Sequence, residues 1–188
     1  TYNVTELLVA GYAASFSSGC SGNITNGEVK VCNITNDDTP ATKIIVIKKV
    51  INNNGGTATP SNFTINVSGN SPFPASFSGQ GFPGTIVNIG TGAYNVSEIP
   101  LAGYAASFSG CSGNISAGET RECNITNDDL PATLIVIKNV INNNTGALVP
   151  SSFIISVNGT AGNATFKGSS AGVNLTLNAG TYNVTEGF

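Results

Sequence analysis

The chain has 188 residues, of which 40% are hydrophobic and only 9% are charged, and its formal net charge is −3. So few cations disfavour nucleic acid or an anionic membrane as a partner, and no apolar run approaches the ~20 residues of a membrane-spanning helix. The chain contains no His, which excludes a Ser-His-Asp catalytic set. We therefore expect a protein that is not an enzyme and needs no cofactor.

Short alternating runs of apolar and polar residues begin with YNVTE at 2–6 and continue with FTINVSG at 63–69 and FIISVNG at 153–159. They lie between clusters of Gly, Asn and Pro, and no stretch has a helical apolar period. This pattern predicts an all-β chain of sandwiches or barrels.

The chain repeats itself with a period of roughly 90 residues. The opening TYNVTE returns at 181–186, and YNVSE stands between them at 94–98. The other repeated segments are 11–42 with 103–133, 44–56 with 134–146, and 60–69 with 150–159. A polar run with proline, NDDTPAT or NDDLPAT, separates apolar strands in both copies and is typical of a linker.

Cut at these linkers, the chain is predicted to hold the back half of a repeat at 1–38, a complete repeat at 43–129, and the front half of a repeat at 134–188. Neither half can cover its own apolar face. We expect each half to be completed by a neighbouring identical unit, in the same long chain or in a separate copy. Such head-to-tail pairing propagates into a fibre.

Four cysteines stand at corresponding places in two repeats. A turn centred on residues 26–27 lies midway between the first two, and a turn at 117–118 lies midway between the others. Each pair is therefore predicted to face across a hairpin and to form a disulfide, which favours an oxidising, extracellular setting. Four free thiols or a zinc site are the alternatives, although no CxxC or His supports zinc. The cysteines are Cys20, Cys32, Cys111 and Cys123.

Strand parity places three polar residues toward the core. If the apolar faces of IIVIKKV, YNVSE and CNITN point inward, then Lys48, Glu98 and Asn127 also point inward,. A lone buried lysine costs several kcal/mol, and a nearby carboxylate would offset part of that cost.

The run GAYNVSEIPLAGY at 92–104, the lysine of the first strand and the asparagine of the last strand resemble collagen-adhesin B-type domains. These are also called SpaA-like or prealbumin-like domains of bacterial surface proteins and pilins. The resemblance implies a prealbumin-like, immunoglobulin-like β-sandwich and an isopeptide bond. In it Lys48 is the nucleophile, Asn127 the acceptor and Glu98 the proton shuttle. An apolar pocket favours the neutral forms that this chemistry needs.

Other interpretations of these residues remain. Asn124 competes as the acceptor, although parity disfavours it. A buried Lys–Glu ion pair without a covalent bond, or unrelated exposed positions, would leave the same residues. In the half repeats the corresponding residues are Glu6, Asn36, Lys138 and Glu186. If Lys138 joined Asn36 of the next unit, the fibre would be covalently locked.

Asn-x-Ser/Thr sequons are more frequent than composition predicts, and several have outward parity. They favour attached glycans, although a solvated β-face copied by repetition is the alternative. The sequons begin at Asn3, Asn23, Asn33, Asn62, Asn66, Asn95, Asn114, Asn124, Asn143, Asn158, Asn163, Asn174 and Asn183.

The NDD runs at 36–38 and 127–129 lack the spaced acids of a calcium loop, so we interpret them as solvated linker and predict no metal site. The residues together favour a structural repeat subunit of an extracellular filament, a pilus-like fibre or an adhesin stalk. The alternative is an adhesin module that binds a glycan or matrix ligand through its loops, where Phe73 and Phe82 are the best candidates.

Overall fold

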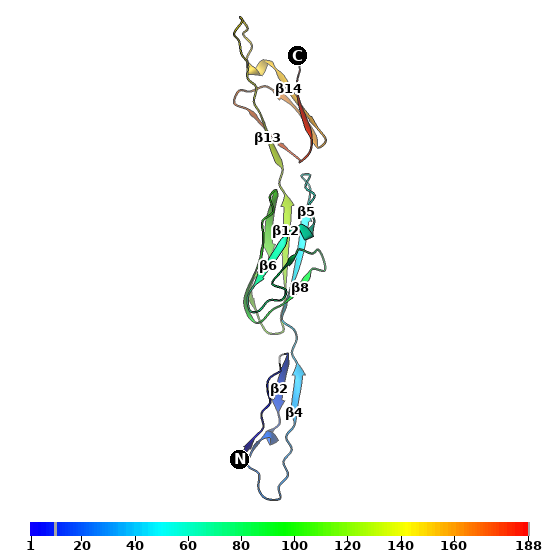
Figure 1. Ribbon diagram of the computed structural model, residues 1–188, viewed down its shortest axis with the longest axis vertical. Helices are drawn as coiled ribbons and strands as arrows, with labels where there is room; N and C mark the ends of the chain where they lie inside the picture. The colour runs from blue at the N-terminus through cyan, green and yellow to red at the C-terminus, as the bar shows by residue number, and fades with distance from the viewer. Residues whose placement is uncertain (10, 188) are drawn as a thin grey trace.

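The protein is an elongated all-β chain in this computed structural model, which describes residues 1–9 and 11–187. Three parts follow one another along the long axis, and the two termini lie toward opposite ends (Figure 1). The described residues form strands and three short 3₁₀ turns but no α-helix; the turns are η1 (Ser18–Cys20), η2 (Pro60–Asn62) and η3 (Pro150–Ser152). The described residues contain no helix that is long and apolar enough to cross a membrane.

The middle part is a sandwich of two four-stranded sheets. The first sheet has the order β10-β12-β5-β8, with bounds Tyr104–Ser109, Thr120–Asp129, Lys43–Ile51 and Thr85–Asn88. The second has the order β11-β9-β6-β7, with bounds Ser112–Ile115, Gly92–Glu98, Thr64–Ser68 and Ser76–Ser78. The all-β prediction is therefore correct.

Alternation along the strands builds the core of this sandwich. Ile44 and Val46 of β5 and Ile125 of β12 are fully buried, and they meet Ile65 and Val96 from the facing sheet in one apolar cluster. Each strand contributes every second residue because successive side chains of a strand point to opposite faces.

The first and last strands of the sandwich pair in parallel. β5 and β12 run side by side from the Lys43–Thr120 pair to the Ile51–Asp128 pair. Parallel neighbours need a long crossover connection, and here the connection comprises all the other strands of the sandwich. The strand that begins this sandwich and the strand that ends it therefore lie side by side.

The N-terminal part contains only the strands that correspond to β9–β12. They form two separate two-stranded sheets, β1 with β3 and β2 with β4. Their bounds are Tyr2–Asn3, Tyr12–Phe16, Ser21–Gly22 and Ile34–Asp38. No strand covers the outer edge of β4 among the described residues, so Ile34 is 40% exposed although its counterpart Ile125 is fully buried.

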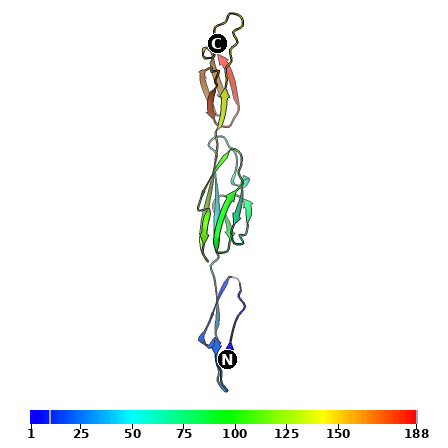
Figure 2. The ribbon, with the colours of Figure 1, turned by 90° about the vertical axis from the view of Figure 1, so that its left-hand side faces the viewer.

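The C-terminal part contains the strands that correspond to β5–β9. β13 pairs with β16, and β14 lies between β15 and β17. Their bounds are Ala132–Val136, Ile154–Gly159, Gly162–Lys167, Val173–Leu177 and Tyr182–Gly187. Turned by 90°, the molecule again shows the three parts in line (Figure 2).

The predicted hairpin geometry of the cysteine pairs is wrong, although both pairs are bonded. Cys20 joins Cys32 and Cys111 joins Cys123. β11 pairs with β9 and β12 pairs with β10 and β5, so the strands flanking the second bridge belong to different sheets. The disulfide therefore ties the two sheets together instead of joining neighbours within one sheet.

Candidate functional site

Three strands bring Lys48, Glu98 and Asn127 together. Lys48 lies opposite Ile125 on the parallel pair of β5 and β12, and Asn127 is two residues further along on the same face. Glu98 is the last residue of β9 in the opposite sheet, where it pairs with Ile65. The site therefore lies between the two sheets, where the predicted parity placed these side chains.

The three side chains form a closed triangle of polar contacts. Lys48 Nζ lies 2.9 Å from Glu98 Oε2 and donates a hydrogen bond to Asn127 Oδ1. Asn127 Nδ2 donates to Glu98 Oε1 at 2.6 Å. The amine thus lies beside the amide that it would attack, and the carboxyl group contacts both the amine and the amide nitrogen.

The site is dry. Lys48 and Asn127 are each 1% exposed, and the side chain of Glu98 is equally buried. Burial lowers the pKa of Lys48, and the hydrogen bond and charge of Glu98 oppose this shift without cancelling it. A lowered pKa raises the fraction of neutral, nucleophilic amine at a given pH.

Two residues that the sequence analysis did not single out form the walls of this pocket. Lys48 Nζ lies 4.1 Å from the centre of the Phe63 ring, which can stabilise a cation at its face,. A side chain at Gly79 would collide with the stem of Lys48. A repeat comparison could have found both, because Phe153 and Gly168 stand in the same relation to Lys138.

The two other parts each hold two members of the same triad. In the N-terminal part Asn36 Nδ2 donates to Glu6 Oε1 at 2.6 Å. In the C-terminal part Lys138 Nζ lies 2.9 Å from Glu186 Oε2, with side chains 21% and 30% exposed. The first pair has no lysine at hand and the second has no asparagine, so neither forms the triangle within the described residues.

Asp129 has a structural role that the sequence analysis missed. It is 4% exposed, not part of a solvated linker, because β12 continues through it. Its carboxylate accepts hydrogen bonds from the N–H groups of Asn53, Asn54 and Gly56 at 2.6–3.0 Å. Burial alone would raise the pKa of Asp129, but these hydrogen bonds lower it overall. The sequence signal that could have revealed this contact is that the NDD run, at 36–38 and 127–129, and the NNN run, at 52–54 and 142–144, both recur with the repeat.

The sequon asparagines lie mostly on the surface. All are exposed except Asn66, which is half-buried. Asn62 is exposed too, but its Oδ1 accepts hydrogen bonds from the backbone N–H and hydroxyl of Thr59. Asn124 points away from the triad, where its Nδ2 donates to Glu122 Oε1 at 2.7 Å.

Comparison with known families gives one match. The model of the prealbumin-like fold domain matches residues 38–127 and again 129–187. No curated protein matches the chain. Because the two matches cover most of its length, the chain belongs to the prealbumin-like fold domain family. Membership of this family indicates a surface protein of the pilin or adhesin type, and the two disulfides fit an extracellular location,.

Proposed function

We propose, from its membership of the prealbumin-like fold domain family, that this chain is a structural repeat subunit of an extracellular filament assembled head to tail. One observation carries the proposal. The N-terminal part contains the counterparts of β9–β12 and the C-terminal part contains the counterparts of β5–β9, so two copies together hold every strand of one complete repeat.

The complete repeat supplies the register for this assembly. Its β12 pairs with β5, so β4 of one copy would pair in parallel with β13 of the next. In the complete repeat Ile125 lies opposite Lys48, and the equivalent pair would be Ile34 and Lys138. β1 and β17 both correspond to β9, so one of them is displaced when the copies join.

The buried triad gives the repeat a covalent lock. Neutral Lys48 Nζ attacks the Asn127 side-chain carbonyl, and Glu98 takes a proton from the amine and passes it to the amide nitrogen. The C–N bond of the amide breaks, ammonia leaves, and an isopeptide bond joins Lys48 to Asn127. The reaction occurs once per site, so it is a maturation step and not turnover of a substrate.

The same reaction would lock neighbouring copies. Complementation brings Lys138 of one copy to Asn36 of the next, with either Glu186 or Glu6 as the proton shuttle. Docking would also bury Lys138, which is the condition that lowers the pKa of Lys48 in the complete repeat,. Bond formation between copies therefore follows docking.

Intact mass tests the lock within the complete repeat. Chain produced without glycosylation should weigh one ammonia less than the sequence for the internal bond, and two hydrogens less for each disulfide. Lys48→Arg should retain the ammonia, and Asn127→Ala, which lacks the side-chain amide, should differ from its own sequence mass only by the disulfide hydrogens. An unmodified mass for the wild-type chain would leave a buried ion pair and no isopeptide.

Self-association tests the filament. Sedimentation velocity over a range of concentrations should show growing species, and electron microscopy should show filaments. Species that resist boiling and reducing agent should form a ladder that Lys138→Arg or Asn36→Ala abolishes while non-covalent association persists. A wild-type chain that stays monomeric at high concentration contradicts the proposal.

Glycans at the exposed sequons form the outer surface of the proposed filament, where they shield strand edges from proteases. Expression in a glycosylating host should add glycan mass that an Asn-glycan-specific amidase removes. The exposed positions, such as Asn95 and Asn114, should be modified before the half-buried Asn66.

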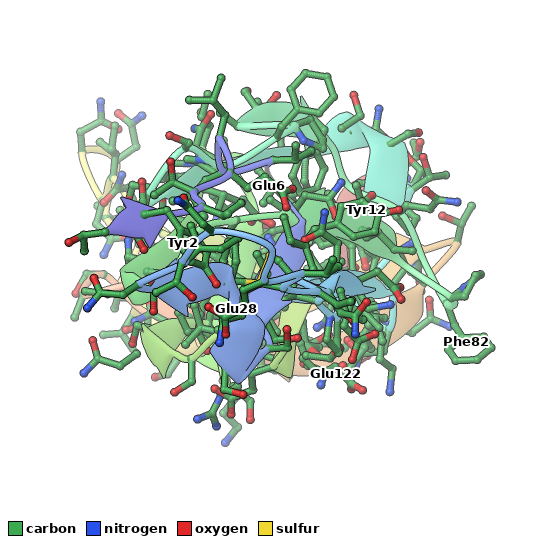
Figure 3. All side chains as sticks on the ribbon, turned by 90° about the horizontal axis from the view of Figure 1, so that it is seen from below. Tyr2, Glu6, Tyr12, Glu28, Phe82 and Glu122 are labelled. Atoms are coloured by element: carbon green, nitrogen blue, oxygen red, sulfur yellow. A yellow bond between two sulfur atoms is a disulfide. The ribbon has the colours of Figure 1, made fainter. Side chains whose placement is uncertain are left out.

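A binding module is the second candidate function. Phe73 and Phe82 are highly exposed in loops of the complete repeat, and Phe82 projects from the side of the molecule in the end-on view (Figure 3). Exposed aromatic rings can stack on sugars. A glycan array separates the two functions: binding that Phe82→Ser abolishes would favour the module, whereas no binding leaves the filament.

A further inference from the structure

The Asp129 loop is part of the joint between successive repeats. Asn54 N–H and Gly56 N–H bind the buried carboxylate, and Asn54 Nδ2 donates to the Asp129 carbonyl at 2.7 Å. On its other side the loop offers the Asn54 carbonyl to the N–H of Ala179 in the C-terminal part, at 2.7 Å. The carboxylate therefore stabilises the loop that contacts the next part of the rod (Figure 1).

Tyr104 closes the same cluster. Its hydroxyl donates to Asn52 Oδ1 at 2.7 Å and accepts from the N–H of Ala58 at 2.9 Å. A side chain at Gly56 would collide with the Tyr104 hydroxyl and with Asp129. The loop, the acid and the tyrosine thus fit one another closely.

The C-terminal part contains a second copy of this loop at 142–146, and its internal contacts are the same. Asn142 Nδ2 donates to the Leu148 carbonyl at 2.9 Å, as Asn52 Nδ2 does to the Ala58 carbonyl at 3.0 Å. Thr145 has a φ of 67° and its counterpart Gly55 has a φ of 88°. The second loop therefore holds the conformation that binds a carboxylate in the first.

No acceptor among the described residues binds the N–H groups of Asn143, Asn144 or Gly146. Asp38 has the complementary deficiency. It lies opposite Tyr12 in the register that places Asp129 opposite Tyr104, and it is exposed. The acid and tyrosine of the N-terminal part thus match the unoccupied loop of the C-terminal part.

We infer that Asp38 of one copy docks into the backbone N–H groups of Asn143, Asn144 and Gly146 of a neighbouring copy. This inference rests on the proposed head-to-tail assembly and names its recognition contact. Backbone donors to a carboxylate form charge-assisted hydrogen bonds, which are stronger than neutral ones. The contact requires an acid and a tyrosine on one partner and this loop on the other. It therefore favours another copy of the same chain as the partner.

Substitution at Asp38 tests the contact in the full chain. Asp38→Asn keeps the shape and removes the charge, and it should weaken self-association about tenfold or more in sedimentation measurements. Asp37→Asn makes the same charge change on the adjacent residue, whose side chain points to the other face, and should leave association near the wild-type value. Protection of the β2 and β4 amides in hydrogen exchange shows whether these two strands still pair in both variants.

A substitution in the loop at 142–146 tests the same contact from the other partner. In the free chain a Cβ at Gly146 meets only the end of the flexible Asn142 side chain, at 3.0 Å. In a docked joint it would collide with the acid and the tyrosine, as at Gly56. Gly146→Ala should therefore weaken association as strongly as Asp38→Asn, without destabilising the free chain.

Hydrogen exchange gives the direct readout. On association of the wild-type chain, the N–H groups of Asn143, Asn144 and Gly146 should become protected. If the wild-type chain associates and both variants associate equally well, the docking contact is wrong and the filament stands. If the wild-type chain never associates, both proposals are wrong.

Discussion

The first strand of the middle part, β5, and the first strand of the C-terminal part, β13, have nearly the same sequence and different lengths. β5 runs from Lys43 to Ile51, whereas β13 ends at Val136 and its continuation at 137–141 is not a strand. β5 pairs with β8 only as far as Val46, and beyond that point the strand that pairs with it among the described residues is β12. Residues 137–141 correspond to the segment of β5 that pairs only with β12, and without a counterpart of β12 beside them they do not form a strand.

The same difference governs the polar site. The side chain of Lys48 is fully buried, whereas that of Lys138 is 21% exposed, although each contacts a glutamate at 2.9 Å and a phenylalanine ring. The missing strand would supply both the asparagine and the cover. The lysine is therefore fully buried beside an asparagine only in the part whose last strand is present.

The largest predicted effect comes from removing the buried lysine. Lys48→Met leaves Glu98 buried without its cation, and we expect the complete repeat to lose about 3–5 kcal/mol of unfolding free energy. Lys138→Met is the matched control and should cost less than about 1 kcal/mol, because water reaches Glu186. Denaturant unfolding followed by hydrogen exchange measures the cost of Lys48→Met at β6 and β9 and the cost of Lys138→Met at β14 and β17. Equal costs would contradict the contrast between the two sites.

The disulfide that ties the sheets should have the next largest effect. Replacing Cys111 and Cys123 by Ser should destabilise the complete repeat by about 2–4 kcal/mol in thermal unfolding. Replacing Cys20 and Cys32 instead should leave that repeat unchanged, because this bridge lies in the N-terminal part. A comparable loss in both double variants would mean that the parts do not unfold separately.

Asp129→Asn should have a local effect. The amide group presents a donor where the carboxylate accepted, so the N–H groups of Asn53, Asn54 and Gly56 should exchange about tenfold faster or more. Asp128→Asn is the control, because Asp128 Oδ1 has no hydrogen-bond partner among the described residues. Faster exchange in the control but not in Asp129→Asn would contradict the assignment.

Acid should reproduce the Asp129 effect reversibly. The carboxyl group titrates near 3.8 when unperturbed and has a lower pKa in the folded chain. Its stabilising contribution is therefore complete above about pH 4 and is lost as the pH falls through the folded pKa. The amide chemical shifts of Asn53 and Gly56 should follow this titration, and those of Asn143 and Gly146 in the monomer should not. A flat profile at Gly56 would contradict the carboxylate contact.

Much of the site could be predicted from local pattern. Strand parity placed Lys48, Glu98 and Asn127 inward, and the repeat placed the cysteines in pairs. The sheet membership of the second disulfide could not be read from the turn at 117–118, because a turn does not determine whether its two strands pair with each other. Asp129 was interpreted as linker because an acidic run before proline carries no local sign of the distant loop that covers it.

The sequence by itself determined the alternation, the repeat and the identity of the residues on each face, since these depend on the period of a strand and on the order of residues. Only the tertiary structure decided how long each strand is, that Lys48 is buried while Lys138 is partly exposed, and that Asp129 is buried. These properties depend on a partner strand that lies far along the chain, and pairing in space is not encoded in any single segment.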